Sequence, residues 1–145
     1  MSGNHVAGHV LGIQRVLYRG AMEKDVVDLP GVIGPYSQAV RAGGMLYVSG
    51  QPGIDPATGE PAGSSFDEEA RQSFANLRTV LEAGGSRLDL VVNTTVLVSD
   101  HANFAALNDL YAEFFPTEPP ARMTMQVPLP RGLLISIGCI AIVAD

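Results

Sequence analysis

Arg122 is the residue whose type and position most need a chemical explanation. It begins the extended run RMTMQV, residues 122–127, in which alternate side chains point to opposite faces of a strand. Arg122, Thr124 and Gln126 therefore share one face, and we expect the two methionines between them to pack on helices. Arg122 then points to the other face of its sheet. A partly buried arginine needs an anionic partner, and its planar fork fits a carboxylate, which either a ligand or an acidic residue of a neighbouring subunit can supply.

Two further polar segments lie at the ends of expected strands, which is where ligand-binding groups are often found. They read GPYSQ at residues 34–38 and SGQP at residues 49–52. Glycine, proline and serine also build turns, and the residues alone favour that plainer role.

Histidine and cysteine give little evidence for a metal or a nucleophile. His5 and His9 are four residues apart, as two ligands on one helix face would be, but no third candidate ligand lies near them. His101 follows Asp100 at an expected helix start, where a solvated or capping role is favoured. Cys139 lies among isoleucines, where cysteine is usually an inert small hydrophobic residue, and a nucleophilic role is the lesser alternative. We therefore predict no metal site.

The composition is that of one folded domain that does not attract nucleic acid. The 145 residues are 46% hydrophobic and 17% charged, which is too apolar for a disordered chain and sufficient for one core. Fifteen acidic residues against nine basic ones give a net charge of −6, which disfavours a surface that collects phosphates. The apolar runs are too short to cross a membrane. The single cysteine cannot form an internal disulfide, so we expect a cytoplasmic protein.

The chain divides into an extension and one domain. Residues 1–21 are expected to be a poorly ordered N-terminal extension, within which apolar residues at helical spacing permit a short amphipathic helix over residues 6–17. The regular hydrophobic pattern begins at residue 22 and continues to residue 145, so we place the folded domain there.

Two helices and six strands are expected in this domain. Ser65 caps the first helix through an S-x-x-E motif, and Gly84 follows its end. Asp100 caps the second helix, which ends before Pro116. The expected strands are residues 26–29, 36–41, 45–49, 90–98, 121–127 and 133–143. The order β-β-β-α-β-α-β-β predicts an α+β fold, with one mixed sheet and both helices on one of its faces.

The last strand is apolar on both of its faces. One face carries Ile135, Ile137, Cys139 and Ala141, and the other carries Leu134, Ser136, Gly138, Ile140 and Ile142. Two helices cover only one face of a sheet, so the second face needs another cover. We therefore expect a homo-oligomer that forms a small closed ring with its sheets facing inward.

Six segments in a fixed order carry a resemblance that covers the chain from about residue 27 to its end. They are GPYSQAV (34–40), LYVSGQPGIDPATGE (46–60), ARQSFANLRTVLEAGGS (70–86), VVNTTVLVSD (91–100), FAALNDLYAEFF (104–115) and PPARMTMQVPLP (119–130). This combination resembles the RidA/YjgF family, also named L-PSP endoribonuclease-like. The resemblance implies a chorismate-mutase-like fold, a homotrimer with sites in the clefts between subunits, and hydrolysis of reactive 2-imino acids and enamines to 2-oxo acids and ammonia. It implies no metal and no organic cofactor.

The resemblance also implies roles for individual residues. Arg122 matches the arginine that clamps the substrate carboxylate, and Thr124 takes the place of a residue whose backbone carbonyl helps to hold the attacking water. The other implied substrate-binding positions are Tyr36, Ser49, Gly50 and Asn108.

One position departs from the family pattern. Deaminating members usually carry a glutamate in the last strand that orients or activates the water, and alignment from Leu129-Pro130 puts Gly138 at that place. Asp and Glu are absent from residues 123–144, and Cys139 points to the opposite face. Loss of a general acid or base typically costs about 10²- to 10⁴-fold in rate, so the departure predicts weakened or altered hydrolysis.

Two other functions are considered beside hydrolysis. The same cleft would serve a non-catalytic binder of small carboxylic acids. The third reading, an endoribonuclease or translation inhibitor as the older family name suggests, has little support, because the net charge is negative and no histidine pair offers acid–base cleavage of RNA.

Overall fold

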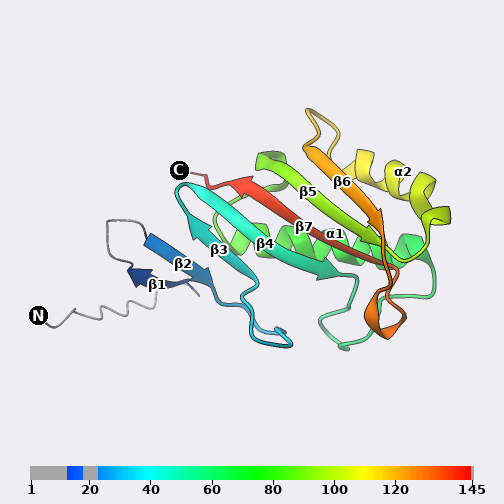
Figure 1. Ribbon diagram of the computed structural model, residues 1–145, viewed down its shortest axis with the longest axis horizontal. Helices are drawn as coiled ribbons and strands as arrows, with labels where there is room; N and C mark the ends of the chain where they lie inside the picture. Colours follow the sequence, from blue (N-terminus) through cyan, green and yellow to red (C-terminus); the bar gives the residue numbers. More distant parts are fainter. Residues whose placement is uncertain (1–12, 18–22, 145) are drawn as a thin grey trace, which may run out of the picture.

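A single mixed sheet with two helices packed behind it forms the fold of the computed structural model, which describes residues 13–17 and 23–144 (Figure 1). The described strands lie in the order β1-β2-β3-β4-β7-β5-β6, and only the β5–β6 pair is parallel. The strands are β1 Ile13–Leu17, β2 Glu23–Val27, β3 Ala39–Ala42, β4 Met45–Pro52, β5 Val91–Val98, β6 Ala121–Gln126 and β7 Ile135–Ile142. The helices are α1 Phe66–Ala83 and α2 Phe104–Phe114, with short 3₁₀ turns at Leu88–Leu90, His101–Asn103 and Pro130–Gly132.

The N-terminal segment differs from the expectation. Strand β1 pairs antiparallel with β2, so the suggested helix is wrong at Ile13–Leu17, and the sheet extends into the segment assigned to the extension. A short isolated helix is marginal in water, whereas an extended segment supplies partners for the unpaired backbone groups of a neighbouring edge strand. The rest of the suggested helix, with His5 and His9, lies outside the described residues.

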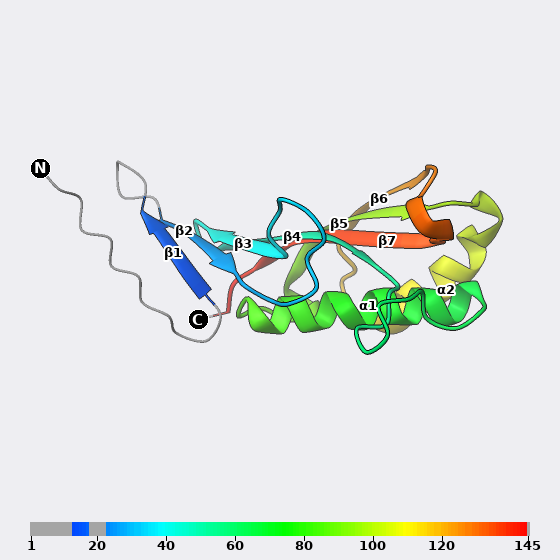
Figure 2. The same cartoon turned by 90° about the horizontal axis from the view of Figure 1, so that it is seen from below.

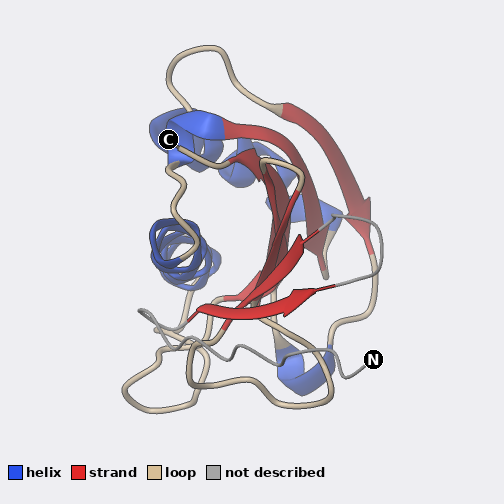
Figure 3. Cartoon of the chain, turned by 90° about the vertical axis from the view of Figure 1, so that its left-hand side faces the viewer, coloured by secondary structure: helices blue, strands red, loops and turns tan. Residues whose placement is uncertain are grey.

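Both helices cover the same face of the sheet, as the sequence predicts (Figures 2 and 3). Phe74, Leu77 and Leu81 of α1 are fully buried against it, and Leu107 and Leu110 of α2 complete the layer. Within the described residues, no helix is long and apolar enough to cross a membrane.

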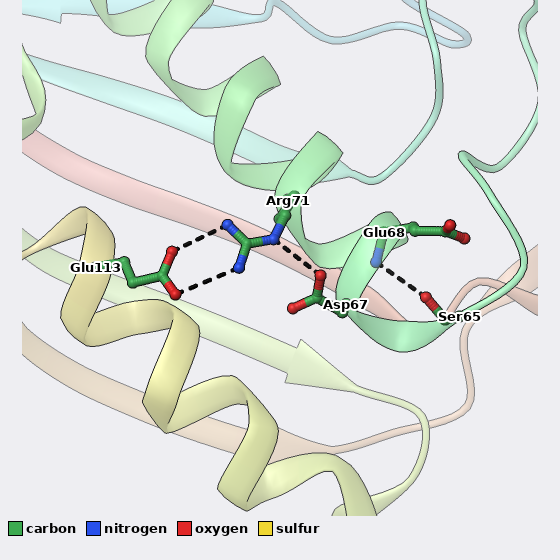
Figure 4. Close-up of polar contacts among 5 residues, drawn as sticks. All are labelled: Ser65, Asp67, Glu68, Arg71 and Glu113. Atoms are coloured by element: carbon green, nitrogen blue, oxygen red, sulfur yellow. Dashed lines mark hydrogen bonds and ion pairs between the residues drawn. The ribbon is translucent and has the colours of Figure 1, made fainter.

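The start of α1 confirms the predicted cap and ties the two helices together (Figure 4). The Ser65 hydroxyl accepts a hydrogen bond from the Glu68 backbone N–H at 3.2 Å, while the Glu68 carboxylate accepts one from a backbone N–H just before the cap. Arg71 donates to Asp67 in its own helix at 2.8 Å and to Glu113 of α2 at 2.9 Å. The exposed ion pair with Glu113 thus links α1 to α2.

The second face of the sheet carries exposed apolar side chains. Met123 is 59% exposed, Tyr47 48%, Ile142 44% and Met125 40%. The register places Met123 beside Thr95, which pairs on its other side with Gly138, and places Tyr47 beside Ile140, all on the side away from the helices. An apolar second face is therefore confirmed, but the methionines of β6 belong to it and not to the helix-covered face.

Candidate functional site

Arg122 lies on the helix-covered face, which corrects the prediction that it points to the second face. It pairs in register with Thr94 of β5, a fully buried residue of the core side. Its guanidinium carbon lies 4.7 Å from the ring centroid of Tyr111 and 5.6 Å from that of Phe104, both on α2. The alternation along β6 was predicted correctly, but the aromatic rings of α2 attract the guanidinium to the helix-covered face through cation–π contacts.

The guanidinium of Arg122 has no carboxylate partner in the described part of the chain. The ion pairs formed there by arginine belong to Arg71, Arg87 and Arg131. Arg122 is only partly buried, so its donors lie within reach of a molecule that enters from solvent. The described residues supply no carboxylate to Arg122, so both predicted alternatives, a ligand carboxylate and an acidic residue of a neighbouring subunit, remain.

Asn108 lies on the same side of α2 as the two rings. Phe104, Asn108 and Tyr111 are spaced i, i+4 and i+7, which puts them along one helical face. Asn108 is exposed, and its amide can both donate and accept hydrogen bonds. The structure thus brings the predicted residues Arg122 and Asn108 to the same edge of the molecule.

Thr124 has both backbone and side-chain features suited to a polar guest. Strand β6 is the edge of the sheet, and Val127 donates its backbone N–H to Val98 of β5. Because backbone groups alternate along a strand, the carbonyl of Thr124 points away from β5 to the free edge. The Thr124 hydroxyl is buried without a hydrogen-bond partner among the described residues. The carbonyl assigned to hold a water is therefore available.

Ser49 and the segment before β3 form a second polar cluster. The Ser49 hydroxyl donates to the Ser37 carbonyl at 2.6 Å, and its backbone N–H donates to the Gln38 carbonyl at 2.9 Å. The Gln51 amide donates to the Gln38 side chain at 2.9 Å. The Tyr36 side chain beside this cluster is 51% exposed. The turn chemistry considered at first is present, and it places Tyr36 and Ser49 on neighbouring segments.

Gly50 and Gly138 meet at an irregularity in the β4–β7 pairing. The register shifts between Val48 and Gln51, and a Cβ built on Gly138 would lie 3.1 Å from the Val48 carbonyl oxygen and 3.5 Å from the Gly50 backbone nitrogen. A side chain at position 138 would therefore begin in a tight space. Gly138 pairs with Thr95 on the open face, so the structure does not bring it together with Arg122.

The titratable groups near the site do not supply a nucleophile. Cys139 is 5% exposed, and burial raises the pKa of its thiol to about 12, which keeps it protonated and inert. Burial also raises the pKa of the Tyr111 hydroxyl, against the effects of its hydrogen bond with Thr94 and of the nearby guanidinium of Arg122. No group of three or more potential metal ligands occurs in the described ranges.

The residues that sequence reasoning missed are Phe104 and Tyr111. Both lie at helical spacing in α2, a pattern typical of an apolar stripe that packs on the core, and Tyr111 is indeed buried. The signal that was available is the asparagine between them, a polar residue in an otherwise apolar stripe beside an arginine-bearing strand.

The mixed sheet with paired helices defines a chorismate-mutase-like α+β domain. The chain belongs to the RidA/YjgF family, since the family described as Endoribonuclease L-PSP matches residues 27–143. The human 2-iminobutanoate/2-iminopropanoate deaminase is 43% identical over 114 residues, which cover 78% of this chain and 83% of that protein.

Solved structures agree with this assignment. The Rid family protein YyfA from Yersinia pestis matches with a TM-score of 0.79 and 40% identity, covering 83% of this chain and 99% of that one. E. coli TdcF with bound serine matches with a TM-score of 0.74 and 34% identity, covering 79% and 93%. Relatives at about 40% identity are named deaminases, so the family-level function is deaminase-like.

Proposed function

We propose that this protein hydrolyses small 2-imino acids to 2-oxo acids and ammonia, with Arg122 as the clamp for the substrate carboxylate. The observation that carries the proposal is the guanidinium of Arg122, partly buried on two aromatic rings and without a carboxylate partner in the described part of the chain. A substrate carboxylate would complete its hydrogen bonds in a planar, two-pronged geometry.

The reaction depends mainly on how the water and the imine are oriented toward each other. Water adds to the carbon of the C=N bond, and the resulting tetrahedral adduct expels ammonia to leave a C=O bond. We propose that the outward carbonyl of Thr124 accepts a hydrogen bond from the attacking water while Arg122 fixes the carboxylate next to the imine carbon. Holding two reactants in position in this way lowers the entropic part of the barrier. Asn108 at the same edge is proposed to contact the substrate as well.

The names of relatives support a small amino-acid-derived substrate. The human relative is named for 2-iminobutanoate and 2-iminopropanoate, and the TdcF structure holds serine. Both kinds of molecule carry a carboxylate on the carbon that bears nitrogen, which is the group Arg122 is suited to bind.

We propose that the protein is a homotrimer whose site is completed between copies. Arg122, Thr124 and Asn108 lie at the edge formed by β6 and α2. Ser49, Gly50 and Gly138 belong to the β4–β7 region, and Tyr36 precedes β3. The exposed apolar side chains of the open face support burial against other copies. In this arrangement, the edge of one copy would meet the β4 region of the next.

A second candidate function is non-catalytic binding of small carboxylic acids in the same cleft. It is favoured by the absence of Asp and Glu from residues 123–144, which leaves the last strand without a general acid or base. The same absence supports hydrolysis that is weaker, or directed to other substrates, than in relatives with a glutamate at position 138. The single cysteine, buried and free, fits a reducing compartment, and we propose a cytoplasmic location.

The two functions are separated by one coupled assay. A serine dehydratase generates 2-aminoacrylate, which tautomerises to the imine, and the release of pyruvate is followed with and without this protein. Hydrolysis predicts faster release, and the Arg122→Ala variant should lose about 10- to 100-fold in kcat/KM through the loss of a charge-assisted contact. The matched control is Arg78→Ala, which removes an arginine stacked 5.4 Å from the Phe114 ring, away from Arg122. Pyruvate binding without acceleration would favour the binder, and an unchanged Arg122→Ala variant would remove the clamp.

A further inference from the structure

We propose that Tyr111 and Phe104 are positioning residues that hold the guanidinium of Arg122 so that its N–H edge faces an incoming carboxylate. This inference rests on the proposed function, because it concerns how the clamp is aimed. It assigns to α2 a part in ligand recognition that the periodicity of its apolar residues does not indicate.

The two rings lie on the guanidinium from one helix. Tyr111 approaches to 4.7 Å and Phe104 to 5.6 Å, and both distances are within the range in which a cation is attracted to a ring face. Phe104 and Tyr111 are seven positions apart, which is about two helical turns, so the rings lie along one side of α2, facing β6. A long flexible side chain is thereby confined beside a rigid surface.

Tyr111 is itself fixed from three directions. Its hydroxyl shares a hydrogen bond of 2.8 Å with the Thr94 hydroxyl, and its ring packs on Phe115 at 4.7 Å and edge-on to Phe74 at 6.0 Å. Tyr111 is only 6% exposed. Its position therefore does not depend on a bound ligand.

Thr94 closes the arrangement on the sheet. It is the register partner of Arg122 on the neighbouring strand, and it is fully buried. The strand neighbour of the arginine thus holds the ring on which that arginine lies. Strand β5 contributes Thr94, β6 contributes Arg122 and α2 contributes both rings, so a change in the packing of α2 would move the guanidinium.

Stacking leaves the guanidinium able to bind an anion. A guanidinium that lies flat on a ring makes its π contact through its face, which leaves the N–H donors in its plane free to match both oxygens of a carboxylate. An arginine free in solvent must lose many rotamers when it binds, and one already held on a ring loses fewer. The rings should therefore strengthen carboxylate binding without touching the reacting atoms.

The experiment measures pyruvate binding, together with KM and kcat in the coupled assay, for wild type, Tyr111→Leu, Phe104→Leu and Tyr111→Phe. Loss of either ring should weaken pyruvate binding and raise KM by about three- to tenfold, with kcat changed less than about twofold. Tyr111→Phe keeps the ring and should bind within about twofold of wild type, although it leaves the Thr94 hydroxyl unpaired. Phe104 is 39% exposed, so its variant tests the inference even if Tyr111→Leu does not fold.

The matched control is Phe114→Leu. Phe114 also lies on α2, but its ring contacts the guanidinium of a different arginine, Arg78. This variant should lower the melting temperature and leave pyruvate binding unchanged. NMR of the free protein supplies a readout that needs no ligand, since side-chain protons of Arg122 should be shifted upfield by the rings and should lose this shift in the two leucine variants.

The outcomes separate the two proposals. If the wild-type protein neither binds pyruvate nor accelerates its release, the proposed function is wrong. Wild type that binds pyruvate, with leucine variants that bind it equally well, overturns the positioning role alone. The same holds if Phe114→Leu weakens binding as much as Phe104→Leu does, because the effect would then be general loss of packing.

Discussion

Arg122 and Gly138 lie at the same level of the sheet and point to its opposite faces. Thr94 pairs in register with both Arg122 and Cys139, so Gly138 is one residue out of step and belongs with Thr95 on the open face. Side chains at positions 122 and 138 therefore diverge within one copy. A cleft that contains both requires a second copy, which is the geometric argument for a site shared between subunits.

The first prediction tests whether position 138 belongs to the site. Gly138→Glu restores a carboxylate to the last strand and should increase hydrolysis of small imino acids by about tenfold or more, while weakening the binding of bulky or dianionic carboxylates. The added charge enters a mostly apolar face, and the Cβ would lie 3.1 Å from a backbone oxygen, so a small shift of β4 is expected. The measurements are pyruvate release and the affinity for a dicarboxylate.

Gly138→Ala is the matched control, because it adds the Cβ without the charge. Light scattering must first show that both variants assemble as wild type does. If Gly138→Glu assembles and neither hydrolysis nor binding differs from the alanine variant, position 138 does not face the site.

The second prediction concerns assembly through the open face. Met123→Glu places a charge on the most exposed methionine of the open face. It should convert the proposed trimer into smaller species, because an unpaired carboxylate would be buried between copies. Ala75→Glu puts the same charge on the exposed side of α1 and should leave the mass unchanged. Multi-angle light scattering gives the mass of each variant. A Met123→Glu protein with the mass of wild type would show that this part of the sheet is not an interface.

Much of the fold follows from local pattern, and the helices show why. The cap at Ser65 and the apolar repeat behind it define α1 closely, because both are local and depend on few residues. The alternation in β7 was also predicted, since Ile135 and Ile137 are fully buried while Ser136 between them is not.

The local pattern could not predict which side chains of β6 face the helices. Alternation shows that Arg122 and the methionines point to opposite faces, but it does not show which face the helices cover. That choice depends on α2, whose rings receive the arginine, and it leaves Met123 on the apolar open face. Strand β1 was missed for a related reason, because its existence depends on pairing with β2 and not on its own pattern.

The third prediction concerns a buried carboxylate that holds the start of β7. Glu69 is 4% exposed, and its Oε2 accepts backbone N–H bonds from Leu134 at 2.5 Å and Ile135 at 3.2 Å. Glu69→Ala should lower the free energy of unfolding by about 3 kcal/mol, since it leaves two N–H groups without a charged acceptor. Glu68→Ala, which removes an exposed carboxylate at the same helix start, should cost about 1 kcal/mol. Urea denaturation that shows equal losses would contradict the role of Glu69.

The last prediction uses the thiol of Cys139, whose pKa burial raises from about 9 to about 12. Below pH 9 the thiol is protonated in both folded and unfolded chains, so its contribution to stability is fully present. As the pH rises from 9 toward 12, only the unfolded chain ionises, and stability falls. Relative to Cys139→Ala, wild type should lose about 2 kcal/mol of unfolding free energy between pH 8.5 and 10.5. Urea denaturation at several pH values measures this difference, from which the titration of Tyr111 and other common groups cancels. A difference that stays constant over this range would mean that the thiol ionises in the folded protein as easily as in the unfolded one.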